Sequence, residues 1–365
     1  MNSQFCHIND TYLCNTDGMQ TKIPLLNREL GVLEFNSRVL AQAEDPKTPL
    51  LERLRFVCIV SSNMDEFFEI RMSGIKEQLK SNSKNKTPDG LLITEAYKVV
   101  TAQAHDLVAR KYRLLQEEII PKLNKEGVSF FTSNQWTSAQ KAWAKNFFHQ
   151  ELVPLLTPIA LDPAHPFPKV INKSLNFFVT LEGEDSFGRK PKLAVVQAPR
   201  SLPRVVPMPK HLCDQPFGFV LLSSFMQAFV PELFQGMTVT GCHQFRVTRN
   251  SDLFVSEDDI TDLRAALQGE LPTRHLGDAV RLEITADMPE DLTKYLLKAE
   301  SLNREDCYQV NGPVNLVRLV QIPDLVDIPK FKFPNHQPTQ SVELAAGESL
   351  LDKISREDIL LHHPY

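Results

Sequence analysis

The segment PLLERLRFVCIVSSNMDEFFEIR, residues 49–71, decides how the first part of this chain folds. Apolar residues recur at helical spacing from Leu50 to Val60, which predicts a helix with one buried face. Small and charged residues then interrupt the apolar run before two phenylalanines, Phe67 and Phe68, restore it. This interruption needs either a structural or a functional explanation.

Local backbone chemistry explains part of the interruption. Ser62 and Asp65 have the spacing of a capping box, which predicts that a new helical segment begins at Ser62. Capping gives no role to Asn63, whose amide can donate and accept hydrogen bonds together, as the edge of a purine requires. If Asn63 only marks a helix boundary, Asn63→Asp should leave stability nearly unchanged, because aspartate caps as well as asparagine does.

Working outward, the chain divides by pattern into successive parts. Residues 1–24 have no useful periodicity and are expected to be a flexible leader. Residues 25–124 carry helical apolar stripes around a polar loop at 81–90, which predicts an all-helical domain. Residues 125–339 alternate short strands and helices, which predicts an α/β domain with these elements in mixed order. Residues 322–338, rich in proline, are expected to connect this domain to 340–365.

Within the α/β part, three stretches are rich in β-branched or aromatic residues and are bounded by turn formers. These stretches, 176–183, 192–199 and 279–287, are predicted strands. Helices are predicted in this part at 223–233 and 257–267, and one short helix at 349–357 is predicted after the connector.

Composition restricts the classes of function. The 365 residues carry a net charge of −5, so a polyanion would have to meet local basic patches, and nonspecific nucleic-acid binding is disfavoured. Six scattered cysteines without a CxxC pair indicate reduced thiols in a cytoplasmic protein. Cys6, His7 and Cys14 lack a second ligand pair at zinc-finger spacing, so no metal site is predicted. No apolar run approaches the ~18 residues of a membrane span.

Several catalytic motifs do not occur. The sequence contains no GxGxxG, no Gly-Lys dipeptide of a P-loop, no HExxH and no GxSxG. His362 and His363 have only two residues after them, and no catalytic residue is predicted in this chain. Two stretches, 71–86 and 186–210, are locally basic, with net charges of +4 and +6. Such unopposed charge suits phosphate, although a solvated surface is the alternative interpretation.

Long motifs give the chain a specific resemblance. Residues 26–45, LNRELGVLEFNSRVLAQAED, followed by 49–71, resemble the amino-terminal helical domain of bacterial polyphosphate kinases. LTPIALDPAHPFP, FRVTRNSDL, AVRLEITADMP and VNGPVNLVRL are similar to the head domain of that family. DILLHHPY, residues 358–365, resembles the start of its first catalytic domain. The resemblance covers residues 26–365 in order, with Gly31-Val32 standing where the family usually has Ser-Trp.

The resemblance implies a multidomain protein and an activity. Family members transfer the terminal phosphate of ATP to polyphosphate, reversibly and through a phosphohistidine. Their nucleophilic histidine and Mg2+ ligands lie in phospholipase-D-like domains that follow the HHPY motif. This chain ends there, so we expect it to be inactive alone. Asn63 and Phe56 match the family positions that contact the adenine of ATP.

The resemblance also leaves alternatives open. One is a polyphosphate kinase of which this chain is the amino-terminal part, and the other is a non-catalytic module for nucleotide contact and oligomerisation. We expect a homo-oligomer formed through the head domain, with Phe177–Phe178 and Phe217–Phe234 as either an apolar contact surface or internal core. The implied location is cytoplasmic, with peripheral attachment to the inner membrane as an alternative, and no nucleic acid is expected as a partner.

Overall fold

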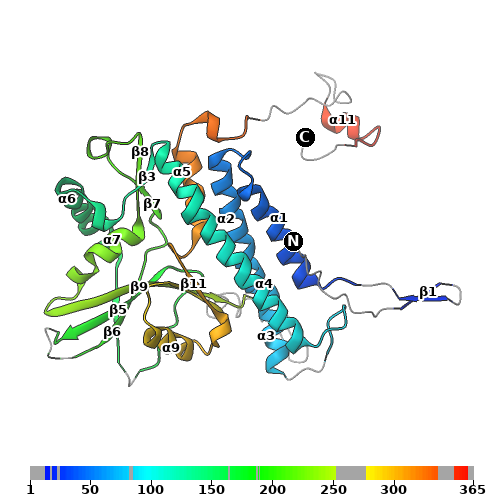
Figure 1. Ribbon diagram of the computed structural model, residues 1–365, viewed down its shortest axis with the longest axis horizontal. Helices are drawn as coiled ribbons and strands as arrows, with labels where there is room; N and C mark the ends of the chain where they lie inside the picture. The colour runs from blue at the N-terminus through cyan, green and yellow to red at the C-terminus, as the bar shows by residue number, and fades with distance from the viewer. Residues whose placement is uncertain are drawn as a thin grey trace.

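The computed structural model describes residues 13–16, 19–22, 25–81, 85–162, 165–185, 188, 190–251, 277–335 and 349–360. A helical part comes first, and α1, α2 and α4 lie side by side in it (Figure 1). This confirms the predicted helical part of the chain. Its α-helices are α1 (Arg28–Glu44), α2 (Leu50–Glu66), α3 (Ser73–Lys80), α4 (Ile93–Leu114) and α5 (Ile120–Lys125).

The helix that carries the 49–71 segment does not restart at Ser62. It runs through α2 into a π-helical turn at Phe67–Met72 and continues into α3. The backbone N–H of Phe67 donates to the carbonyls of Asn63 and Met64, so the helical hydrogen bonds are unbroken there. The predicted capping box is therefore wrong, because no helical N–H groups are left unpaired at Ser62 for a cap to satisfy.

Two short strands lie within the predicted leader. β1 (Leu13–Thr16) and β2 (Met19–Lys22) pair in antiparallel register. The first helix begins just beyond them at Asn27, whose side-chain oxygen accepts hydrogen bonds from the N–H groups of Glu29 and Leu30 at 3.1 Å each. Asparagine is among the best residues for this capping role.

The α/β part is built on a six-stranded sheet in the order β11-β10-β9-β5-β6-β4. Among the described strand pairs of this sheet, only β10–β11 is parallel, so the sheet is mixed, and the predicted α/β domain is confirmed. A smaller sheet has the order β3-β8-β7. The strands are β3 (Val128–Phe130), β4 (Pro158–Leu161), β5 (Asn176–Gly183), β6 (Leu193–Gln197), β7 (Val205–Pro207), β8 (Phe217–Leu221), β9 (Met237–Arg249), β10 (Ala279–Thr285) and β11 (Cys307–Val310).

Helices cover the sheets, as Figure 1 shows. The predicted helices at 223–233 and 349–357 are confirmed, whereas 257–267 lies outside the described residues. The described residues of the predicted connector, 322–335, contain two short helical turns, α10 and a 3₁₀ turn at Pro329–Phe331. The α-helices of this part are α6 (Ser138–Phe147), α7 (Leu222–Phe229), α9 (Glu290–Ala299) and α10 (Ile322–Leu325), and α11 (Leu350–Ile354) follows it in the chain.

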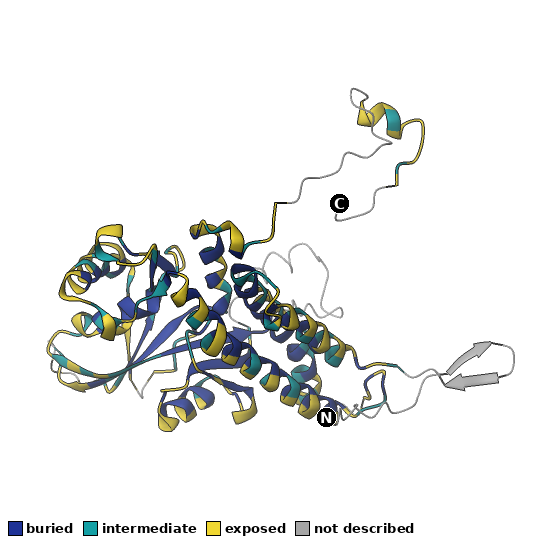
Figure 2. Cartoon of the chain, turned by 45° about the horizontal axis from the view of Figure 1, so that its top comes forward, coloured by how far each residue is buried: buried dark blue, intermediate teal, exposed yellow. Residues whose placement is uncertain are grey.

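The six-stranded sheet is apolar on both faces near its centre. Phe177 belongs to a core that continues into the helical part, while Phe178 belongs to a second core against α9. Both side chains are 0% exposed, and Phe219, Phe225 and Phe229 are at most 2% exposed. These segments are dark blue interior in Figure 2. The expectation of an apolar contact surface at these phenylalanines is therefore wrong, and the internal-core alternative is confirmed.

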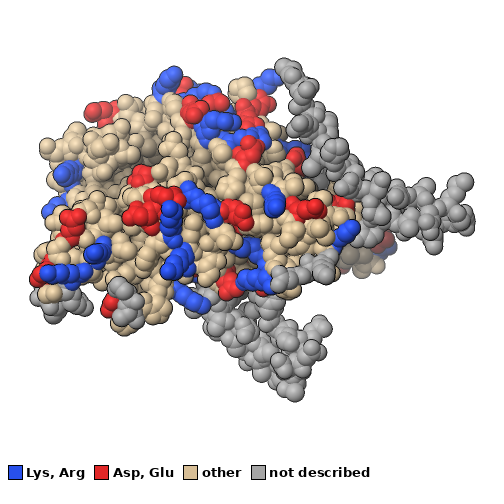
Figure 3. Space-filling view, turned by 60° about the horizontal axis from the view of Figure 1, so that its bottom comes forward, with Lys and Arg blue, Asp and Glu red and all other residues tan. Residues whose placement is uncertain are grey.

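The charged side chains of the described residues do not give the surface a uniform sign. Among the described residues, no helix combines enough length with enough apolar character to cross a bilayer. Figure 3 shows basic and acidic side chains interspersed over one face, consistent with a chain of net charge −5. Any cluster of one sign is therefore a local feature.

Candidate functional site

Asp65 lies at the centre of a buried ion cluster between the helical part and the sheet. Its carboxylate oxygens accept from Nη1 and Nη2 of Arg246 at 2.7 and 2.9 Å, and from Nη2 of Arg281 at 2.6 Å. Glu283 accepts from Arg246 and lies 3.3 Å from Nη2 of Arg281. We call these four residues, together with buried Lys111 beside them, the Asp65 cluster.

The Asp65 cluster holds its acids ionised. Burial alone would raise the pKa of Asp65, but the charges of Arg246 and Arg281 outweigh it and lower that pKa to about 2. The pKa of Glu283 is lowered by the same two guanidinium groups against the same effect of burial. Arg281 also stacks on the Phe68 ring, with its Cζ 4.4 Å from the ring centroid. Every guanidinium in the cluster thus has a partner from this chain.

Lys111 gives the Asp65 cluster one excess positive charge. Burial lowers the pKa of Lys111 to about 8, the nearby Glu283 opposing this effect and Arg281 adding to it. Its Nζ lies 5.2 Å from the ring centroid of Tyr112, a cation–π contact.

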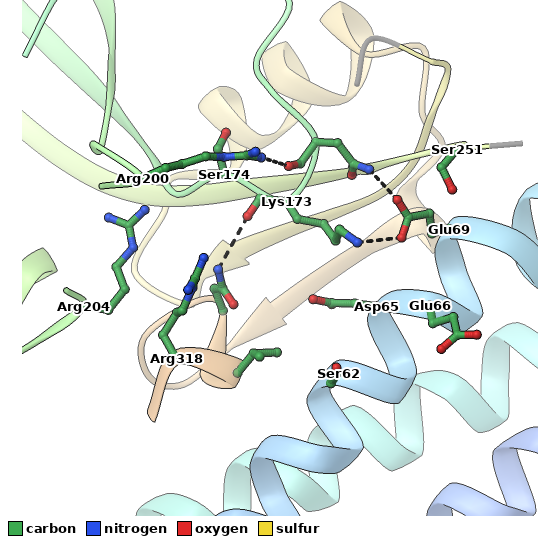
Figure 4. Close-up of a pocket in the computed structure, with 13 residues that line it drawn as sticks. Ser62, Asp65, Glu66, Glu69, Lys173, Ser174, Arg200, Arg204, Ser251 and Arg318 are labelled. Carbon is green, nitrogen blue, oxygen red and sulfur yellow. Dashed lines mark hydrogen bonds and ion pairs between the residues drawn. The ribbon is translucent and has the colours of Figure 1, made fainter. Parts of the chain in front are cut away.

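A cavity of about 670 Å³ opens next to the Asp65 cluster, where α2 faces the α/β part (Figure 4). The helix contributes Ser62, Asp65, Glu66 and Glu69 to one wall, and Arg200, Arg204 and Arg318 come from the opposite side in Figure 4. We call this the arginine cavity. Its remaining lining residues are Asn172, Lys173, Ser174, Ser251, Asn315 and Val317.

Two of the acids in the arginine cavity are already neutralised. Asp65 is paired inside the Asp65 cluster, and Glu69 accepts from Lys173 Nζ at 2.6 Å and from Asn172 Nδ2 at 2.7 Å. Only Glu66 remains among the acids of this cavity without an ion pair to a described residue. The opposite wall therefore keeps its positive charge available for a ligand.

No acid among the described residues forms an ion pair with the three arginines of the cavity. Arg200 donates to the backbone carbonyl of Asn172, but neither Arg204 nor Arg318 forms an ion pair with a described residue. The Nη1 of Arg204 is buried and has no hydrogen-bond partner among the described residues. Burial, followed by the charges of Arg318 and Arg200, lowers the pKa of Arg204 to about 10. A buried donor beside like charges has the chemistry that an anion would satisfy.

The backbone at the arginine cavity is also unusual. Lys173 and Asn315, two of three described non-glycine residues with positive φ, both line it, at φ values of 58° and 66°. The Asn315 amide donates to the Lys173 carbonyl at 3.5 Å, which links the two. Left-handed backbone at non-glycine residues carries a conformational cost and concentrates at ligand sites.

Asn63 lines a different, smaller cavity of about 260 Å³ between α1 and α2. Its Nδ2 donates to Oδ1 of Asn36 at 2.8 Å, and Asn36 is 1% exposed. We call this the asparagine cavity, and Glu66 lines it as well as the arginine cavity. Its other lining residues are Val32, Phe35, Phe67, Ile70 and Arg71.

Phe56 does not line the asparagine cavity. It lies seven residues, about two helical turns, before Asn63 on α2 and packs, half-buried, against the large core. The aromatic rings that do line the cavity are Phe35, which is 51% exposed, and Phe67. Phe56 and Asn63 thus lie about two turns apart on the same helix, and of the two only Asn63 lines this cavity.

The two basic stretches, 71–86 and 186–210, take different places in the structure. In the first, Lys76 pairs with Asp306 at 2.8 Å and Lys80 pairs with Asp278 at 2.5 Å, so these charges are used within the fold. The second supplies Arg200 and Arg204 to the arginine cavity. Sequence inspection did not identify Arg318, which reaches the same cavity from the segment after β11.

Thiols and metal ligands add little to this site. Cys58, Cys213, Cys242 and Cys307 are free. No group of three or more histidine, cysteine, aspartate or glutamate side chains suited to a metal ion occurs in the part of the chain that the structure describes. Cys6 and His7 lie outside that part.

The fold and cavities define a class of protein in which a helical bundle is joined to a mixed α/β unit, with two arginines at the junction, Arg204 and Arg318, that form no ion pair with a described residue. Two family models match this chain: the polyphosphate kinase N-terminal domain at residues 25–131 and the polyphosphate kinase middle domain at residues 139–322. The chain belongs to the polyphosphate kinase family.

Individual relatives agree with the family models. A polyphosphate kinase of Burkholderia multivorans is 58% identical over 347 residues, which are 95% of this chain and 50% of that protein. A polyphosphate kinase of Paraburkholderia phytofirmans is 55% identical over 347 residues, again 95% of this chain and 50% of that protein. The chain therefore spans about half the length of the curated relatives that it matches. The crystal structure of polyphosphate kinase from Porphyromonas gingivalis shares the fold, with a TM-score of 0.75 and 24% identity over 94% of this chain and 48% of that one.

Proposed function

We propose that this chain is the nucleotide-binding and polyanion-binding part of an enzyme that transfers the terminal phosphate of ATP to polyphosphate. The observation that carries the proposal is the arginine cavity, where neither Arg204 nor Arg318 has an ion-pair partner among the described residues and Nη1 of Arg204 is buried without a hydrogen-bond partner among them. Polyphosphate is a linear anion whose oxygens suit guanidinium donors. The adenine of ATP is assigned to the asparagine cavity, through Asn63.

The proposal divides the chain as its sequence pattern does, with a leader at 1–24, a helical domain at 25–124, a head domain at 125–339 and the start of a catalytic domain at 340–365. Phosphoryl transfer through a phosphohistidine, with Mg2+, is assigned to phospholipase-D-like domains outside this sequence. Free thiols at the described cysteines support a reducing, cytoplasmic location.

Phe56 is proposed to support adenine binding by holding α2 in place. It lies on α2 and packs against the large core, so its replacement would shift the helix that carries Asn63. Self-association through the head domain is also proposed. β4 ends the six-stranded sheet and its Ile159 is 44% exposed, so this edge can take part in a contact between copies.

Polyphosphate binding tests the proposal directly. The affinity of the 365-residue chain for polyphosphate should fall about tenfold in Arg204→Met, because this variant loses one charge-assisted hydrogen bond. The slope of log K against log salt concentration should fall by about one. Arg304→Met is the matched control, because Arg304 pairs with Glu290 at 3.3 Å outside the cavity. Equal affinities for all three proteins would contradict the proposal.

Phosphorylation separates the two forms of the proposal. With labelled ATP, Mg2+ and polyphosphate, the chain alone should remain unlabelled, since a covalent intermediate needs an activated nucleophile. A stable phosphohistidine on this chain would instead place the chemistry within these 365 residues. The non-catalytic alternative predicts binding without any transfer, even when the catalytic domains of a relative are added.

A further inference from the structure

The asparagine cavity contains a hydrogen-bond chain with a fixed polarity. Nδ2 of Asn36 donates to the backbone carbonyl of Val32 at 2.9 Å. A carbonyl oxygen can only accept, so the amide of Asn36 must present its nitrogen to Val32 and its oxygen to Asn63. Asn63 therefore has to donate its own Nδ2 to Asn36, as it does at 2.8 Å.

This polarity leaves one group of Asn63 for a ligand. Its Oδ1 accepts no hydrogen bond from any described residue, and Asn63 lines the cavity while Asn36 is buried behind it. The half-exposed Phe35 ring forms part of the same wall, and aromatic rings of this kind stack on nucleobases. The cavity thus offers a ring face and a single oriented acceptor.

We propose that Asn36 is a positioning residue that holds the Asn63 amide with its Oδ1 toward the cavity, so that this cavity prefers a 6-aminopurine nucleotide to a 6-oxopurine nucleotide. The 6-amino group of adenine donates hydrogen bonds, and the 6-oxo group of hypoxanthine only accepts. Two acceptors facing each other repel, and each is left unpaired. The inference rests on the proposed function for the location of adenine, and it adds the residue that sets the selectivity.

The test compares ATP, ITP and inorganic tripolyphosphate as ligands of the 365-residue chain in equilibrium binding. The unchanged chain should bind ATP about tenfold more tightly than ITP, equivalent to about 1.4 kcal/mol. In Asn36→Leu the Asn63 amide can rotate and offer Nδ2 to ITP, so the ratio should fall to about one to three. Tripolyphosphate affinity should not change, because it depends on the arginine cavity.

Two further variants separate positioning from a general structural effect. In Asn36→Asp the buried carboxyl is expected to stay protonated, so it can donate its O–H to the Val32 carbonyl and accept from Asn63 Nδ2, and this variant should retain the preference for ATP. Asn36→Ser is too short to reach Asn63 and replaces Asn36→Leu if the melting curve of the leucine variant shows that it is unfolded. Loss of the preference in both Asn36→Ser and Asn36→Asp would make Asn36 merely structural and overturn the inference.

The outcomes distinguish this inference from the proposed function. Equal binding of ATP and ITP by the unchanged chain overturns the inference and leaves the proposed nucleotide and polyanion binding intact. Binding of tripolyphosphate without any binding of ATP overturns both the inference and the assignment of adenine to Asn63. Failure to bind tripolyphosphate while the preference for ATP persists contradicts the arginine cavity and supports the inference.

Discussion

The arginines of the Asp65 cluster and those of the arginine cavity have the same chemistry in opposite surroundings. Arg246 and Arg281 are at most 2% exposed and share carboxylates at 2.6 to 2.9 Å. Arg204 and Arg318, which belong to the neighbouring cavity, have no carboxylate from the described residues. The difference shows that local composition does not determine the role of a basic residue. What decides is whether the fold also brings it an acid.

The largest expected effect comes from removing the shared acid. Asp65→Asn leaves two buried guanidinium groups short of one negative charge, and breaking a buried pair in this way costs about 3–5 kcal/mol. Urea unfolding measures the loss. Asp324→Asn is the control, because Asp324 is 74% exposed in its pair with Arg55, and such pairs contribute about 0.2–1 kcal/mol. Similar losses in both variants would remove the contrast between the two sets of arginines.

The dependence of the free energy of unfolding on pH should reveal the contribution of the Asp65 carboxylate. The unfolded pKa of aspartate is about 3.9, and the folded pKa of Asp65 is about 2. The stabilisation is thus complete above about pH 4 and is lost as the pH falls toward 2. Urea unfolding at successive pH values should show the free energy of unfolding declining in this window. The slope of that decline gives the number of protons taken up on unfolding, and Asp65→Asn should lower this number by up to one. An identical decline in the variant would mean that other carboxylates determine acid unfolding.

Asn63→Asp tests a contact that is independent of either set of arginines. The sequence alone predicts a neutral change, but Asn63 donates its Nδ2 to Asn36, and a carboxylate at this position would face the oxygen of Asn36. We expect a loss of about 1–2 kcal/mol in thermal unfolding. The control is Asn146→Asp on an exposed helix face, expected within about 0.5 kcal/mol of the parent. A neutral Asn63→Asp would contradict the described amide pair.

The smallest effect should come from α1, away from both sets of arginines. A Cβ added at Gly31 would meet no atom within 4 Å, so Gly31→Ala should raise the free energy of unfolding by about 0.5–1 kcal/mol without changing polyphosphate affinity. At Gly127, with φ at +83° and Pro216 Cδ 2.9 Å from an added Cβ, alanine should destabilise. Thermal unfolding of both variants checks the signs.

The sequence predicts the local elements of this fold well, and it predicts the roles of charged residues poorly. The strands at 176–183 and 279–287 are recognisable because β-branched and aromatic residues cluster between turn formers. In β10, apolar residues alternate with Arg281 and Glu283, a pattern that normally indicates a solvated face. That face is instead buried against α2, which no local pattern indicates.

The candidate site depends on contacts across long stretches of sequence. Asp65 and Arg281 are 216 residues apart, and Asp65 looks like a capping residue when only its neighbours are considered. Arg318 joins Arg200 and Arg204 only in the folded chain. The sequence shows that capping gives no role to Asn63, but it does not indicate the partner Asn36, which lies on another helix.

Stabilisation by a polyanion tests most directly whether the arginine cavity binds one while the Asp65 cluster only supports the fold. Inorganic tripolyphosphate at about 100 times its dissociation constant should raise the free energy of unfolding of the unchanged chain by about 2.7 kcal/mol. Asp65→Asn should start from a lower stability and gain about as much, whereas the double variant Arg204→Met/Arg318→Met should gain almost nothing at the same concentration. An equal gain in the double variant would contradict the account.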